Sequence, residues 1–157
     1  MTLLTGLTTA TVTGGPYGTL TGDVAFAGMV GVLSVSTPLN DAVNGGVLEA
    51  PVTVTIASDG TFTLGPLPCT DDPNLTQGGT YTLSWQVGRF ADCPHGRRDT
   101  TFVLPMAAGA TVDFDLMTPT NGVYYPNGAG PVATTNALLT ESGNILTTEA
   151  GNVLVTA

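Results

Sequence analysis

Asp113 and Asp115 are the carboxyl groups whose spacing first suggests chemistry. They alternate with Val112, Phe114 and Leu116, and this period of two is that of a β-strand, so both carboxylates are expected on one face. Two acids placed together can serve as general acid and general base. The stronger interpretation is the wet face of an edge strand, where charge discourages pairing with another chain. No cleft-lining partner is visible, so we expect no catalytic residue.

Other signatures of enzymes and metal sites are missing from the sequence. It has no G-x-S-x-G, H-E-x-x-H or glycine-rich phosphate loop, and its single histidine, His95, leaves no usual base for a nucleophile. Cys69, Cys93 and His95 would give zinc three ligands at most. The two cysteines either pair or stay as thiols in loops, and the lack of a secretion signal favours thiols. We expect no enzyme activity, no metal and no cofactor.

The most acidic local cluster is Asp71, Asp72 and Asn74 around Pro73. Neighbouring oxygen ligands can hold calcium, but the spacing is not that of an EF-hand loop and no bidentate glutamate follows. Asp and Asn favour turns because their side chains bond to nearby main-chain groups. The cluster therefore predicts a solvated turn capped by Asp.

The charge balance limits the partners. Twelve acidic residues stand against three basic ones, giving a net charge of -9, and the basic residues are Arg89, Arg97 and Arg98. Binding to nucleic acid or to an anionic membrane needs a basic patch that this chain lacks. No apolar run is long enough to span a bilayer, and the first residues lack the positive charge of a signal peptide. We expect synthesis in the cytoplasm, no export and no membrane insertion.

Residues 51–85 are the stretch that the rest of the chain is organised around. Apolar residues alternate with Thr before and after Ser58-Asp59-Gly60, a turn signal that predicts a β-hairpin. A third alternating run follows Gly78-Gly79. The residues expected on the core face are Val52, Val54, Ile56, Phe62, Leu64, Tyr81, Leu83 and Trp85.

The whole chain has the composition of an all-β protein. It has 157 residues with 21 Gly and 11 Pro, and 42% of its residues are hydrophobic against 10% charged. Residues 36–46 are rich in turn signals and predict an insertion loop or a longer hairpin connection. Further strands are predicted at residues 7–12, 20–26, 29–35, 101–104 and 112–116.

Two resemblances follow from these motifs. ASDGTFTLGPLP and then GGTYTLSWQVG resemble the carboxypeptidase-regulatory or transthyretin-like domain, which implies a Greek-key β-sandwich of the transthyretin/Ig-like kind at residues 1–118. The segment CTDDPNLTQ is an insertion relative to that pattern. TDDPNL before a G-x-x-Y strand also resembles minor tail proteins of actinobacterial tailed phages, which implies a structural role in the virion.

An internal repeat occupies residues 137–157, after a Pro-, Asn- and Gly-rich linker at 119–136. Its units, ALLTESGN and ILTTEAGN followed by VLVT, have a period of eight, and each four-residue apolar piece precedes a Glu-x-Gly-Asn turn signal. So short a unit is marginal alone and must pair with the body or with other copies, of which assembly is favoured. The candidate assembly residues are Leu138, Ile145, Leu146, Val153 and Leu154.

Aromatic side chains offer a second kind of contact surface. Tyr81 and Trp85 fall on the predicted core face, where burial is the default. Tyr124 and Tyr125, in the predicted linker, are the better candidates for contact with another protein or a host glycan.

Together these patterns predict a non-enzymatic virion protein, assembled in the host bacterial cytoplasm, that occupies a minor tail or tail-tip position. Its expected partners are other virion proteins and copies of itself, joined through the repeat. A capsid decoration or head fibre protein is the first alternative. A glycan-binding host-recognition module is the second.

Overall fold

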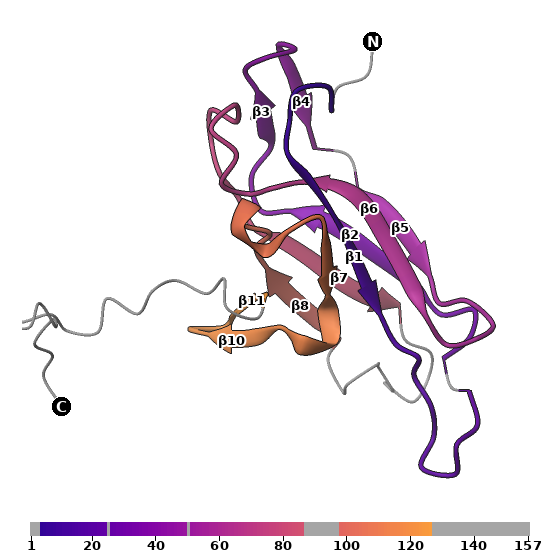
Figure 1. Ribbon diagram of the computed structural model, residues 1–157. Helices are drawn as coiled ribbons and strands as arrows, with labels where there is room; N and C mark the ends of the chain where they lie inside the picture. The colour runs from indigo at the N-terminus through magenta and orange to yellow at the C-terminus, as the bar shows by residue number, and fades with distance from the viewer. Residues whose placement is uncertain (1–3, 25, 50, 87–97, 127–157) are drawn as a thin grey trace, which may run out of the picture.

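A computed structural model describes residues 4–24, 26–49, 51–86 and 98–126 (Figure 1). Within these residues the chain is mostly β, has no α-helix, and forms mixed sheets that do not close into a barrel. The elements are β1 (Thr9–Gly14), β2 (Val30–Val35), β3 (Leu39–Asp41), β4 (Gly46–Leu48), β5 (Val52–Thr55), β6 (Phe62–Pro68), β7 (Tyr81–Gln86), β8 (Asp99–Phe102), β9 (Thr111–Asp113), β10 (Thr118–Thr120) and β11 (Val123–Tyr125), with short 3-10 turns η2 (Met106–Ala108) and η3 (Phe114–Leu116).

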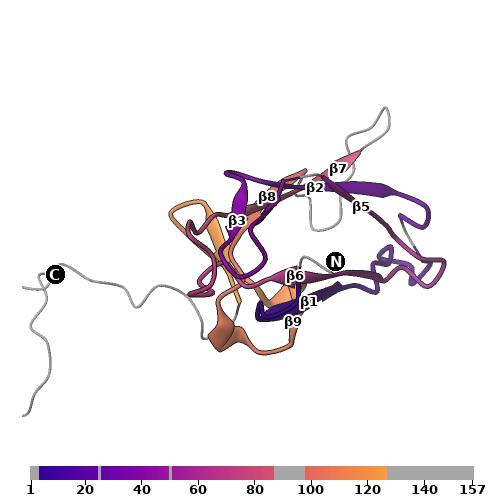
Figure 2. The same cartoon turned by 90° about the horizontal axis from the view of Figure 1, so that it is seen from above.

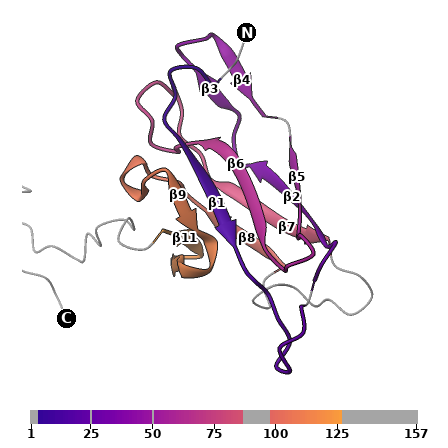
Figure 3. The same ribbon diagram turned by 45° about the vertical axis from the view of Figure 1, so that its right-hand side comes forward.

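Two larger sheets lie in two layers (Figure 2). One sheet has the order β10-β11-β8-β7-β2-β5, and the other has the order β6-β1-β9, whose strands lie side by side in Figure 3. A separate hairpin, β3-β4, stands at one end of the layers (Figure 1). The β1–β9 and β8–β11 pairs are parallel and the others are antiparallel, so both larger sheets are mixed.

Aromatic rings join the layers across the core. The ring of Phe62, from β6, lies 5.4 Å from Trp85 of β7 and 5.6 Å from Phe114 of η3, centroid to centroid. Phe114 in turn meets Phe102 of β8 at 5.8 Å, edge to face. All four residues are at most 2% exposed. Rings that meet edge to face stabilise a core beyond the area they bury, so this cluster holds the two sheets together.

The predicted hairpin between β5 and β6 is wrong. β5 pairs with β2 in the six-stranded sheet, whereas β6 pairs with β1 in the three-stranded sheet. The Asp59-Gly60 turn does close locally, since Ala57 N–H donates to the Thr61 carbonyl at 2.8 Å. Beyond that turn the strands separate, and the chain passes from one layer to the other. The predicted core faces of both strands are buried except at Val52, which is 43% exposed.

The predicted strand at residues 20–26 is also wrong. Leu20 is fully exposed, and the segment closes on itself as a polar loop in which Thr19 N–H donates to the Asp23 carbonyl at 2.8 Å. One isolated bridge joins Gly18 to Val24. The loop lies at the end of the molecule opposite β3-β4 (Figure 1). Local hydrogen bonding of Thr and Asp thus prevails over a weak apolar alternation.

The strand predicted at residues 112–116 is shorter than expected. β9 ends at Asp113, whose carboxylate accepts the Asp115 N–H at 2.9 Å and starts the η3 turn. Leu116 consequently leaves the core and is 60% exposed. Strands do form close to the predicted positions 7–12, 29–35 and 101–104.

Two segments predicted as irregular contain strands. Residues 36–46 form β3 and the start of β4, which is the hairpin alternative for that segment. Most of β10 and all of β11 fall in residues 119–136, predicted as a linker, and they extend the six-stranded sheet as far as Tyr125. Residues 127–157 lie outside the described residues, and the division into domains stays a prediction.

Candidate functional site

An apolar groove of about 320 Å³ lies beside the β3-β4 hairpin. Both layers and the hairpin contribute to it, together with Leu4 from the N-terminal segment. Its principal apolar lining residues are Val35, Leu39, Leu48, Val52, Leu67 and Tyr81. We refer to this feature as the hairpin groove.

The hairpin groove has a closed floor and an open rim. Leu39 and Tyr81 on the floor are at most 2% exposed, whereas Val47 and Val52 on the rim are 54% and 43% exposed. Glu49 is the one charged residue of its lining. Exposed apolar side chains that gather around a hollow indicate a binding surface, so this groove suits an uncharged apolar group.

Tyr81 fixes the floor of the groove. Its hydroxyl donates to the Pro68 carbonyl at 2.9 Å, which connects the first residue of β7 to the last residue of β6 in the other layer. Burial raises the pKa of this phenol well above its ordinary value, and proximity to Cys69 raises it further. The hydroxyl therefore stays protonated and serves as a structural donor.

The turn of the β3-β4 hairpin is built by Asp41. Its carboxylate accepts the main-chain N–H groups of Val43 at 2.9 Å and Asn44 at 3.0 Å. The Asn44 amide donates to Asp41 at 2.6 Å and to the Thr5 carbonyl at 2.9 Å. The hydrogen bonds from Asn44 hold the pKa of Asp41 below 3.8. The hairpin is thus attached to the N-terminal segment through polar contacts.

Asp72 makes the same kind of attachment from the β6–β7 connection. Its carboxylate accepts the N–H groups of Thr8 and Asn74, and the Asn74 amide donates to the Gly6 carbonyl at 3.1 Å. Burial raises the pKa of Asp72, but these hydrogen bonds outweigh burial and leave the pKa below 3.8. The prediction of an Asp-capped turn is confirmed, but the turn is not solvated at Asp72, which is 3% exposed.

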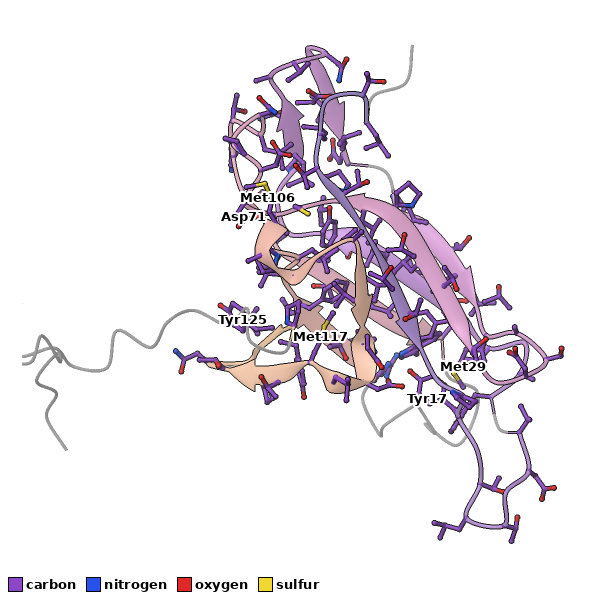
Figure 4. All side chains as sticks on the ribbon, in the orientation of Figure 1. Tyr17, Met29, Asp71, Met106, Met117 and Tyr125 are labelled. Carbon is purple, nitrogen blue, oxygen red and sulfur yellow. The ribbon has the colours of Figure 1, made fainter. Side chains whose placement is uncertain are left out.

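Asp71 has a different hydrogen-bond partner from Asp72. It accepts the Met106 N–H at 2.7 Å, and the two labelled residues lie together in Figure 4. The described part of the chain has no group of three His, Cys, Asp or Glu side chains that could hold a metal ion. The acidic cluster is accordingly used for main-chain attachment.

Asp113 and Asp115 also have structural contacts. The Asp115 carboxylate accepts the Gly15 N–H at 2.8 Å and the Tyr17 hydroxyl at 2.9 Å, which ties η3 to the end of β1. β9 is an edge strand, as predicted. Asp113 is exposed and caps the following turn. This arrangement differs from a pair of free carboxylates on one strand face.

Tyr124 and Tyr125, predicted to contact another protein or a host glycan, both lie among the described residues. Both are half-buried in β11, where Tyr124 lies opposite Phe102 of β8 and packs against the core. Tyr125, labelled in Figure 4, lies opposite Thr118 of β10. The sheet holds these rings and leaves only part of each exposed. Tyr81 and Trp85 are buried, which confirms their placement in the core.

Cys69 is a free cysteine in the β6–β7 connection, as expected, but it is buried at 1% exposure. Burial raises its pKa, and the nearby charges of Asp71 and Asp72 raise it further. The remaining candidates of the sequence lie outside the described residues. They are Arg89, Cys93, His95, Arg97, Leu138, Ile145, Leu146, Val153 and Leu154.

The hairpin groove itself was not predicted from the sequence. A signal for its hairpin is present, because Asn44-Gly45 stands between apolar residues that pair as Leu39 and Leu48. The groove, however, combines residues from six strands, β2 to β7, and the N-terminal segment. No local pattern places those side chains together.

Comparison with protein-family models, with curated proteins and with solved structures finds no match to this chain. Among the described residues, no helix has the length and apolar character needed to cross a membrane.

Proposed function

We propose that this protein is a non-enzymatic structural component of a tailed phage virion, in a minor tail or tail-tip position. The observation that carries the proposal is the eight-residue repeat at 137–157, which follows a folded β body and has too little apolar surface per unit to be stable alone. Repeated short strands gain their stability by pairing with other chains or with a folded body. The repeat therefore joins the protein to its neighbours.

The body suits a Greek-key β-sandwich of the transthyretin/Ig-like kind. Its chain passes repeatedly between two facing layers, for example from β5 to β6 and again from β6 to β7. An aromatic cluster centred on Phe62 and Trp85 fills the space between the layers. A rigid body of this kind presents loops at both ends and tolerates a terminal assembly segment.

The polar groups of the body support a structural role. Asp41, Asp72 and Asp115 each accept main-chain N–H groups, so these carboxylates are used to hold loops in place. The net charge of -9 favours solubility and disfavours nucleic acid as the partner. The hairpin groove is apolar and suits a protein side chain.

Immunogold electron microscopy of the phage particles tests this proposal. Gold-labelled antibody against the protein is expected at the tail end of intact particles. Label distributed over the capsid would replace the tail position with capsid decoration or a head fibre. Absence of label from particles whose other structural proteins are labelled would reject a virion role.

A further inference from the structure

The hairpin groove lies beside two strand edges that have no strand partner among the described residues. β5 pairs with β2 alone, and β6 pairs with β1 alone. Val52 of β5 and Pro66 of β6 both line the groove. An unpaired edge offers a row of main-chain donors and acceptors to an additional strand. The groove and the edges together form a site for a short extended segment with apolar side chains.

The repeat segment of this chain matches that site in length. β5 has four residues, Val52–Thr55, and each apolar piece of the repeat also has four, as in residues 145–148. Such a piece can extend the sheet at β5 and direct alternate side chains into the groove. A cavity of about 150 Å³ accommodates benzene, so 320 Å³ has room for roughly two side chains of Leu or Ile size.

The repeat also matches the site in charge. Glu49 stands at the rim, and the body carries an excess of acidic residues. Glu141 and Glu149 of the repeat fall in its turn signals, outside the apolar pieces. An apolar piece can therefore enter the groove without placing its own carboxylate beside Glu49.

The assembly role proposed above favours an occupant from another copy, because a unit that fills the groove of its own chain joins no neighbour. β11 lies near one edge of the six-stranded sheet and β5 forms the other edge, with β8, β7 and β2 between them. At the ordinary spacing of strands, β11 and β5 are about 19 Å apart. A repeat that enters the groove of a neighbour avoids this path across its own sheet, although the chain between Tyr125 and Ile145 is long enough to span it. Because donor and acceptor surfaces differ, such contacts are head-to-tail.

We propose that the hairpin groove is the acceptor for an apolar unit of the C-terminal repeat of a neighbouring copy, which adds to β5 as a strand. The proposal rests on the assembly role proposed above and specifies the contact through which copies assemble. It does not require a particular position in the virion.

The full-length chain with Val47→Glu and Val52→Glu tests the docking of the repeat into the groove. Both side chains are at the exposed rim, so the fold should tolerate the change, and circular dichroism checks this. A carboxylate buried without a partner opposes docking, and we expect self-association to weaken roughly 10- to 100-fold in light scattering. The matched control is Val24→Glu, a residue 51% exposed on the distant loop, which should associate like the unmodified chain. Equal association of all three chains would overturn the proposal.

Cysteine cross-linking distinguishes a neighbouring copy from the same chain. In a Cys93→Ser background, a chain with Val52→Cys is mixed with a second chain carrying Leu146→Cys. A disulfide-linked pair of chains is expected after mild oxidation. A third chain carries both Val52→Cys and Leu146→Cys. If a disulfide forms only within this single chain and never between two chains, docking between copies is overturned. An unmodified chain that stays monomeric would overturn it too. If the disulfide between chains forms but immunogold label is absent from virions, the virion role is rejected while docking of the repeat into the groove is still supported.

Discussion

Replacement of Phe62 by Leu is a conservative change, but it should lower the free energy of unfolding strongly. Leu retains an apolar side chain in the core but removes the ring. The ring of Phe62 meets Tyr17 at 6.3 Å, Trp85 at 5.4 Å and Phe114 at 5.6 Å. Each aromatic pair contributes about 0.5–1.5 kcal/mol beyond its buried area. The three pairs together predict a loss of about 1.5–4.5 kcal/mol in the free energy of unfolding.

Urea denaturation followed by Trp fluorescence measures this loss, since Trp85 is the only tryptophan and touches the altered ring. For a chain of this length, each kcal/mol lowers the melting temperature by roughly 2–4 °C. The melting temperature of Phe62→Leu should therefore fall by roughly 3–18 °C. The slope of unfolding against urea should stay unchanged, because the surface exposed on unfolding is nearly the same.

Two controls make the result decisive. Phe26→Leu alters a ring that meets Tyr17 at 6.4 Å, and it should cost about one third as much. Thr63→Ala, at the exposed position next to Phe62, should change stability by less than about 0.5 kcal/mol. If Phe62→Leu costs no more than Thr63→Ala, the rings do not hold the two layers together.

Three further changes probe other parts of the core. Tyr81→Phe leaves the buried Pro68 carbonyl without its donor and should cost about 1–3 kcal/mol in urea unfolding; an unchanged midpoint would contradict that bond. Gly31→Ala places a methyl group 3.0 Å from the Trp85 ring and should cost about 1–3 kcal/mol in thermal unfolding, whereas a stabilised variant would contradict the close packing. Burial raises the pKa of the Cys69 thiol, so this thiol should react with a thiol reagent only after denaturation. Peptide mapping by mass spectrometry measures the labelling, and rapid labelling of the native chain would contradict the burial of Cys69.

The sequence predicted most of the side chains that face the core, with Val52 and Leu116 as exceptions, but not which strands are neighbours. Tyr81, Leu83 and Trp85 are at most 2% exposed, as their alternation indicated, because the period of two is a local property of a strand. The turn at Asp59-Gly60 has local hydrogen bonds compatible with a hairpin. Whether the strands beyond it pair or separate depends on competition with β1 and β2, which are distant in the sequence.

The candidate site was less accessible to sequence reasoning than the core. The pattern at Asp72 predicts a turn, but its burial follows from contact with Thr8, 64 residues earlier in the chain. The hairpin groove likewise needs Leu39 of β3 and Leu67 of β6 to meet, although β4 and β5 separate them in the sequence. Long-range contacts of this kind have no local signature. The predicted assembly residues of the repeat lie outside the described residues and stay predictions.

Acid should weaken the β3-β4 turn and the attachment of the β6–β7 connection, because Asp41 and Asp72 accept main-chain N–H groups there. Both carboxylates have a pKa below the ordinary 3.8 in the folded protein, Asp41 chiefly through Asn44 and Asp72 through bonds from Thr8 and Asn74 that outweigh burial. A lowered pKa means that the unfolded chain binds protons more readily, so the stabilisation is present above pH 3.8 and is lost as the pH falls through the folded value.

Amide hydrogen exchange against pH measures this effect residue by residue. Protection of Thr8, Val43 and Asn44, whose N–H groups donate to the two carboxylates, should decline below pH 3.8 before that of Leu83 in the core. Asp72→Asn should reduce the protection of Thr8 at neutral pH and flatten its acid dependence, since the titrating group is gone. An equal loss at Thr8 and Leu83 would mean that acid unfolds the body as one unit. Selective loss would mean that these two attachments loosen while the aromatic core stays intact, because the attachments are polar contacts and the core is held by apolar packing.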